Sequence, residues 1–203
     1  MRRATRIVAS ALGAFAGFGG PEHGTFEVMQ GHVRPEGLLI PSMGPPCDPD
    51  QIWHGCEPAM TVVPSFLITG ILSIIVGLIT MVWAGFFVQR KRGGLILILL
   101  SIALLLVGGG LFPPLIGIVA GVVGTRINAP VARKTSPLSR FLAALWPWSL
   151  IAFFVWVFGQ FVIGTFFNDF LMNSGFLIPF MILGLMALAI ASASARDVER
   201  VAG

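Results

Sequence analysis

The chain has 203 residues, of which 56% are hydrophobic and only 11% are charged, whereas soluble domains carry about 25% charged residues. Its mean hydropathy of +0.90 excludes an ordinary soluble domain and predicts an integral membrane protein. The formal charge of +4 comes from short basic clusters between apolar runs, which are typical of cytoplasmic anchors. We therefore expect a lipid bilayer as the surroundings and no nucleic acid as a partner.

Residues 1–20 form the first apolar segment, in which "MRRATR" precedes "IVASALGAFAGFGG". Arginines, a short apolar core and the triplet Ala14-Phe15-Ala16 are typical of a secretory signal peptide cleaved after Ala16. Because the apolar run continues past this triplet, an uncleaved first membrane helix is the preferred interpretation. Both interpretations place the chain from residue 21 onward outside the cytoplasm.

Residues 21–60 are the one sizeable polar region and are predicted to form an extracytoplasmic loop. Both cysteines of the chain, Cys47 and Cys56, lie in it. In an oxidising compartment such a pair most simply forms a structural disulfide. A redox-active pair is the less favoured alternative, because the spacing is not Cys-x-x-Cys.

The stretch "GPEHGTFEVMQG" predicts a helix of about ten residues, with Pro21 at its first position and Gly31 just past its end. On such a helix His23, Glu27 and Gln30 share one face, which makes them a candidate polar site. That face is either a functional site or simply the hydrated side of a helix at the membrane surface.

A metal site is a weaker alternative for the same region. His23 and Glu27 could ligate a metal together, and His32 or His54 could complete the site. Two ligands from one helix are fewer than a zinc site requires. The sequence therefore predicts no cofactor.

Four long blocks without a charged residue follow the polar region: 61–88, 93–124, 141–167 and 175–193. Each is long enough to enter or cross a bilayer. With the first segment, and with the second block folded back on itself, they predict about six membrane helices. The expected fold is an all-α, polytopic helical membrane protein, with residues 61–203 as its helical bundle.

The reversal in the second block is predicted by charge and by backbone chemistry. A single crossing would leave the basic linker from Arg126 to Arg140 outside, against the positive-inside tendency. A turn at "GGGLFPP" returns that linker to the cytoplasm and leaves only Arg34 of all lysines and arginines outside. We therefore expect a hairpin of two short helices within residues 93–126, either spanning or re-entrant, and both termini in the cytoplasm.

Small residues recur at four-residue spacing, Gly13 with Gly17 and Gly117 with Gly121. Such pairs allow close approach of helices in lipid. Packing inside the bundle is the favoured interpretation, and a contact between two copies of the chain is the alternative.

No enzymatic signature occurs in the sequence, which lacks a nucleophile elbow, a zinc-protease motif, a phosphate-binding loop and a dinucleotide fingerprint. We therefore expect no catalytic residues. The four blocks contain no charged residue, which disfavours proton-coupled transport. Gln160 is the most polar residue deep in a block and is most simply an interhelical hydrogen-bonding group.

The runs "EHGTFEVMQG", "PEGLLIPSMGPPC", "CEPAMTVVPSFLITGIL" and "GGGLFPPLIGIVAGVVGTRI" together resemble a family of small, uncharacterised multi-pass membrane proteins of bacteria. The resemblance covers most of residues 1–127, and the part from about Ala129 onward does not follow it. It implies residence in a bacterial cell membrane and no particular reaction.

Two functional hypotheses follow. The first is a non-catalytic membrane protein that binds a partner, or stabilises a complex, with a second membrane protein or another copy of itself. The alternative is a small permease or channel-like protein with an outer vestibule near Glu22, His23 and Glu27.

Overall fold

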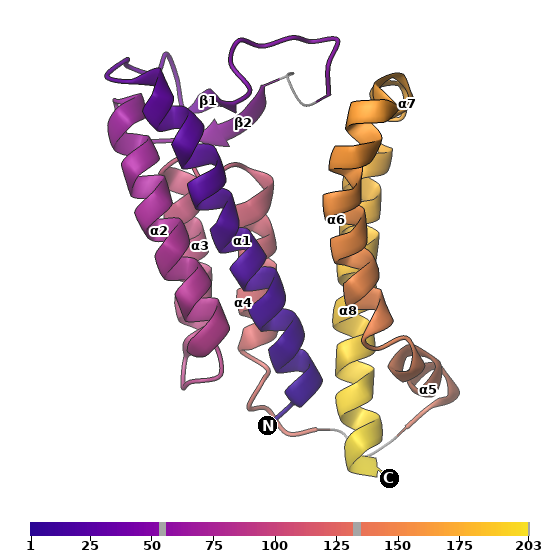
Figure 1. Cartoon of the computed structure of the whole chain (residues 1–203). Helices are drawn as coiled ribbons and strands as arrows, with labels where there is room; N and C mark the ends of the chain where they lie inside the picture. Colours follow the sequence, from indigo (N-terminus) through magenta and orange to yellow (C-terminus); the bar gives the residue numbers. More distant parts are fainter. Residues whose placement is uncertain (53–55, 132–134, 203) are drawn as a thin grey trace. The chain divides into compact units, whose positions relative to one another are not determined.

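The computed structural model describes residues 1–52, 56–131 and 135–202 (Figure 1). Those residues form eight α-helices and one two-stranded sheet. The chain divides into two compact units, and helix α1 (Arg3–Gln30) begins in the first and continues into the second. The first unit comprises Met1–Val8, Asp50–Trp53 and Ile127–Gly203, and the second comprises Ala9–Pro49 and His54–Arg126.

The second unit contains most of α1, three further helices, two strands and the candidate site. After α1 come β1 (Leu39–Met43), β2 (Glu57–Met60), α2 (Phe66–Phe86), α3 (Gly93–Leu106) and α4 (Phe112–Gly124). In Figure 1 the two strands lie at one end of these helices.

Helix α1 is continuous through Pro21, so the prediction that a new helix starts at this proline is wrong. The first apolar segment and the polar helix are one element that ends at Gln30, where Gly31 takes a left-handed φ of 75°. The proline removes one backbone hydrogen bond. Close packing of α1 against α2 on both sides of Pro21 holds the helix together despite this loss.

That packing depends on glycines that bring two backbones together. A Cβ atom on Gly24 would lie 2.6 Å from the Gly70 carbonyl oxygen, and one on Gly77 would lie 2.5 Å from that of Gly17. The Ser73 hydroxyl of α2 also donates to the Gly20 carbonyl oxygen over 3.1 Å. Small residues thus provide the α1–α2 contact, as they do between helices in lipid.

Helices α3 and α4 form the predicted hairpin, because the chain reverses between Leu106 and Phe112. A Cβ on Gly117 would meet Ser101 of α3, and one on Gly121 would lie 2.8 Å from the Gly94 carbonyl oxygen. Gly13 of α1 faces Ala84 and Leu97 in the same way. The small-residue pairs noted in the sequence therefore pack inside this unit.

The fold is mostly helical, as predicted, but the region predicted as a loop contains an antiparallel β-hairpin. Strand β1 pairs with β2, with Ile40 opposite Ala59, and Cys47 and Cys56 form a disulfide with Cα atoms 5.2 Å apart. The disulfide pairing is as predicted. We call residues 31–49 and 56–62 the cap.

The first unit contains α5 (Pro137–Ala144), α6 (Trp148–Phe166), α7 (Asn168–Asn173) and α8 (Leu177–Ala202). The predicted block 141–167 is therefore divided between α5 and α6. The Ser149 and Ser192 hydroxyls join α6 to α8, and the Ser139 hydroxyl of α5 donates to a Glu199 carboxylate oxygen of α8 over 3.0 Å.

Among the described residues, α2, α6 and α8 are long and apolar enough to cross a membrane. Helices α3 and α4 are apolar but shorter, with 14 and 13 residues. The structure therefore contains three candidate spans, where the sequence predicted about six membrane helices.

The α1–α2 contact predicts opposite effects for two glycines of the same helix. Gly77→Ala should destabilise the protein by about 1–3 kcal/mol, because the added methyl group meets α1 backbone. Gly85→Ala has open space around the new Cβ and should be neutral or slightly stabilising, since alanine favours helix. Thermal unfolding in detergent, followed by circular dichroism, compares them. Equal midpoints for the two variants would contradict this packing.

Candidate functional site

Two ionisable side chains of α1, His23 and Glu27, are fully buried at the end of the helix that carries the cap. Their exposed fractions are 1% and 0%, so the alternative interpretation as a hydrated helix face does not hold for these two positions. The cap and the turn between α3 and α4 cover this face. Buried ionisable groups are costly unless they are paired, and they are therefore functional candidates.

Glu27 is held from one side by the cap and from the other by the turn. The Ser42 hydroxyl of β1 donates to Glu27 Oε1 over 2.6 Å. A Cβ atom on Gly108 would lie 2.5 Å from the same oxygen, and Gly108 has a φ of 96°. Glu27 Oε2 has no hydrogen-bond partner among the described residues. Only glycine satisfies both the φ angle and the close approach at this position.

His23 lies in a similar position one turn earlier on α1. Its Nε2 atom is 3.8 Å from Glu57 Oε2 at the start of β2, and a Cβ on Gly110 would lie 2.5 Å from that nitrogen. Gly110 also has a positive φ, 81°. His23 Nδ1 has no hydrogen-bond partner among the described residues.

Glu57 connects this buried pair to the surface, because 42% of its side chain is exposed. Partial burial raises the pKa of the Glu57 carboxyl group, since removal from water disfavours the charged form. At 3.8 Å the imidazole and the carboxylate are beyond direct hydrogen-bond distance, so they can interact through charge but do not share a proton. Glu57 therefore places an acidic group between the buried His23 and the surface of the cap.

Gln30 completes the polar face, with Nε2 donating to the carbonyl oxygens of Pro41 (3.1 Å) and Ser42 (3.4 Å). The three predicted residues His23, Glu27 and Gln30 thus all meet the cap from one helix. Glu22, the remaining acid in this part of α1, is half-buried.

Backbone hydrogen bonds join the cap to the turn in addition to the contacts of these side chains. The Gly108 amide donates to the Met60 carbonyl oxygen over 2.9 Å, and the Val62 amide donates to that of Leu106 over 3.0 Å. The Thr69 hydroxyl of α2 donates to the Val107 carbonyl oxygen over 2.9 Å. Four segments distant in sequence therefore meet around His23 and Glu27.

Sequence reasoning did not find Ser42, Glu57 or the two glycines as members of this cluster. The available signal was weak: Glu57 is an acid just before a long apolar block, and the triple glycine was interpreted only as a flexible turn. Partners from separate segments cannot be paired from one sequence.

The weak metal candidates are not brought together. His32 is exposed, and His54 lies outside the described residues. Within residues 1–52, 56–131 and 135–202, no three side chains of His, Cys, Asp or Glu are grouped as a metal site would need.

Comparison of the chain with protein-family models, with curated proteins and with solved structures finds no match.

The close contact between the turn and Glu27 predicts that Gly108→Ala is more harmful than Gly31→Ala. Both variants force alanine into a positive φ, but a Cβ on Gly31 meets nothing within 4 Å. Gly108→Ala should therefore destabilise the protein by at least about 1 kcal/mol more. In the background Glu27→Ala the penalty should shrink, which a double-mutant cycle in denaturant detects. Additive effects would argue against the contact.

The raised pKa of Glu57 predicts a pH-dependent stability difference between the wild type and Glu57→Gln. The folded state binds this proton more tightly than the unfolded state, whose carboxyl pKa is near 4.5. Protonated Glu57 therefore stabilises the folded state most below pH 4.5, and this stabilisation is lost as pH rises through the folded-state pKa. Melting temperatures of the wild type should fall relative to Glu57→Gln as pH increases. A melting-temperature difference between the two proteins that stays constant from pH 4 to 8 would refute this pH dependence.

Proposed function

We propose that the protein is an integral membrane protein of about six membrane helices, with both termini in the cytoplasm and the cap outside. The three candidate spans support membrane residence. Residence in a bacterial cell membrane is part of the proposal and follows from the family resemblance of residues 1–127.

The proposed sidedness is supported by hydrogen bonds between segments that are predicted to lie on the same side of the membrane. At one end of the first unit, the Arg2 amide donates to the Ile127 carbonyl oxygen over 2.9 Å and Asp197 binds the start of α1. All three segments are predicted to be cytoplasmic. Elsewhere in that unit, Asn168 donates to the Asp50 carbonyl oxygen over 2.8 Å, and both residues are predicted to be outside.

We propose further that the protein is non-catalytic and binds a protein partner through its cap. The observation that carries this proposal is that the polar side chains beneath the cap bond to the protein itself. Gln30, Ser42 and Glu27 bond to one another or to the cap backbone, which fixes the cap to the helix ends. A fixed surface binds at a lower entropic cost than a mobile loop.

The outward face of this fixed cap carries large apolar side chains. Val33, Leu38, Leu39 and Val62 are all more than half exposed. Exposed apolar groups on a polar, extracytoplasmic segment can take part in a protein contact surface. A second membrane protein or another copy of this chain fits such a surface.

A permease is the second candidate, favoured by the unpartnered polar atoms. His23 Nδ1 and Glu27 Oε2 are buried without hydrogen-bond partners among the described residues. Ionisable groups of this kind mark solute or ion paths in membrane proteins. Glu22, His23 and Glu27 would then line a vestibule beneath the cap.

One pair of experiments separates the candidates. A photoreactive amino acid at Leu39 in living cells should give a discrete protein adduct, whereas the same group at the exposed Leu78 of α2 should not. Leu38→Asp should reduce the Leu39 adduct by at least about tenfold, because a charge replaces an apolar contact. Arg34→Gln, also exposed on the cap, is the matched control and should leave the adduct unchanged.

The second experiment measures ion and small-solute flux in reconstituted vesicles. Flux in the wild type that is lost in the double variant His23→Ala with Glu27→Ala would support the permease and overturn the partner-binding proposal. Flux equal to that of empty vesicles, together with the Leu39 adduct, would support partner binding.

A further inference from the structure

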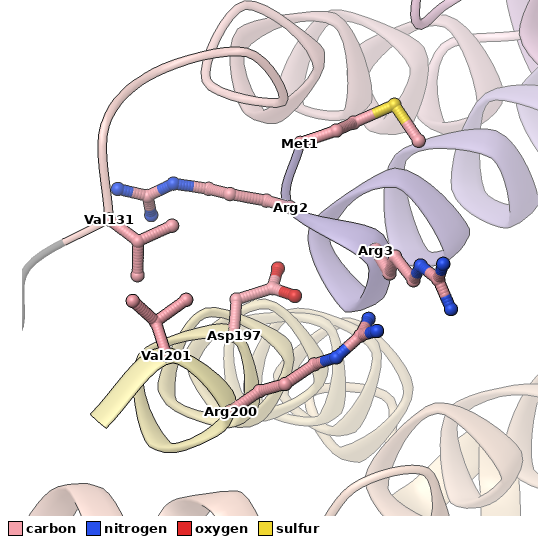
Figure 2. A pocket seen from close by; sticks show the side chains of 7 residues that line it. All are labelled: Met1, Arg2, Arg3, Val131, Asp197, Arg200 and Val201. Atoms are coloured by element: carbon pink, nitrogen blue, oxygen red, sulfur yellow. The ribbon is translucent and has the colours of Figure 1, made fainter. Parts of the chain in front are cut away.

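A pocket of about 430 Å³ lies in the first unit, where the start of α1 meets the end of α8 (Figure 2). Three arginines line it, together with one carboxylate and a few apolar side chains. It is separate from the polar cluster beneath the cap, which belongs to the second unit.

The single carboxylate, Asp197, is fully engaged by the protein. It accepts hydrogen bonds from the Ala4 amide (3.0 Å), the Thr5 amide (2.9 Å) and the Thr5 hydroxyl (2.7 Å), and it is 4% exposed. Asp197 therefore caps the N-terminus of α1. Because Asp197 already bonds to the backbone amides at the start of α1, these amides are not available to a ligand. The contact instead fixes Arg2 and Arg3 of the chain start beside Arg200 of α8.

Arg2 is fixed in a different way. Its guanidinium group donates to the carbonyl oxygens of Pro130 (2.6 Å) and Ala129 (3.4 Å). These bonds hold the side chain along one wall of the pocket, and Figure 2 shows it extending towards Val131. They leave its positive charge unneutralised.

Arg3 and Arg200 are exposed, and neither side chain has a hydrogen-bond or ion-pair partner among the described residues. Both line the same pocket, and Figure 2 shows them extending to the same side of Asp197. Two unpaired guanidinium groups beside one cavity repel each other unless an anion lies near both. With Arg2 and Asp197 included, the formal charge of the lining side chains is +2 (three arginines, one aspartate).

The position of the pocket along α8 indicates which anions can reach it. The apolar part of α8 precedes Arg196, and every charged residue of the helix lies between Arg196 and Arg200. If α8 spans the bilayer, as in the proposed function, the pocket lies at the level of the lipid headgroups. Met1 and Val201 supply an apolar edge beside the guanidinium groups.

We propose that this pocket binds a phosphate group through Arg3 and Arg200. Guanidinium groups bind phosphate oxygens in a bidentate manner, and basic pockets at the cytoplasmic ends of membrane helices bind anionic headgroups. The phosphate comes from an anionic phospholipid or from a soluble phosphate compound. Both sources share the phosphate chemistry that the guanidinium groups of Arg3 and Arg200 recognise.

The test is native mass spectrometry of the full chain in detergent with added phosphatidylglycerol or phosphatidylcholine. The wild type should retain one phosphatidylglycerol molecule in preference to phosphatidylcholine. The double variant Arg3→Gln with Arg200→Gln should bind it at least about tenfold more weakly. Arg196→Gln removes a charge from the same end of α8 without altering the pocket lining and should bind as the wild type does.

A second double variant tests whether weaker binding results from misfolding. Arg3→Lys with Arg200→Lys keeps the charge but loses the bidentate geometry, and its binding should be intermediate. Equal weakening by Arg196→Gln, no preference for phosphatidylglycerol, or no binding at all would overturn the proposal.

Inorganic phosphate distinguishes the two sources. In the wild type, millimolar phosphate is compared with chloride at the same concentration. If phosphate displaces phosphatidylglycerol and chloride does not, the result would support the site and assign it to a soluble phosphate compound. Retention of the lipid in that mixture would support the site and assign it to a headgroup. Neither result involves the cap, so this proposal and the partner-binding proposal fail independently.

Discussion

The structure of the second unit depends on the close approach of a glycine backbone to two buried ionisable side chains. Gly108 lies against Glu27 and Gly110 lies against His23, both at positive φ. A side chain at either glycine would push the α3–α4 hairpin away from α1. That displacement would also break the backbone hydrogen bonds that join the turn to Met60 and Val62. The positions of the cap, the α3–α4 hairpin and α1 therefore depend on one another.

Local and electrostatic signals in the sequence were sufficient for much of this arrangement. The basic linker after Arg126 predicted a reversal at the triple glycine, and α3 and α4 are the two arms of that hairpin. The presence of both cysteines, Cys47 and Cys56, in one predicted extracytoplasmic region predicted their pairing. These predictions succeeded because each rests on neighbouring residues, or on a charge rule that applies along the whole chain.

Contacts between distant segments could not be predicted in the same way. The β-hairpin was missed because strands of five and four residues, rich in proline, lack a clear alternating pattern. Pro21 was mistaken for a helix start, because the α2 glycines that support α1 there lie about fifty residues away. The burial of His23 and Glu27 could not be predicted for the same reason, because the segments that cover them are β1, β2 and the turn.

Amide hydrogen exchange tests the central claim most directly, because the Gly108 and Val62 amides report the junction of turn and cap. In the wild type both should exchange slowly, and in Glu27→Ala both should lose protection together, at least about tenfold, while amides of α6 stay unchanged. This result would show that the buried carboxylate holds cap and turn as one unit. Unchanged protection at Gly108 and Val62 in Glu27→Ala would contradict the account.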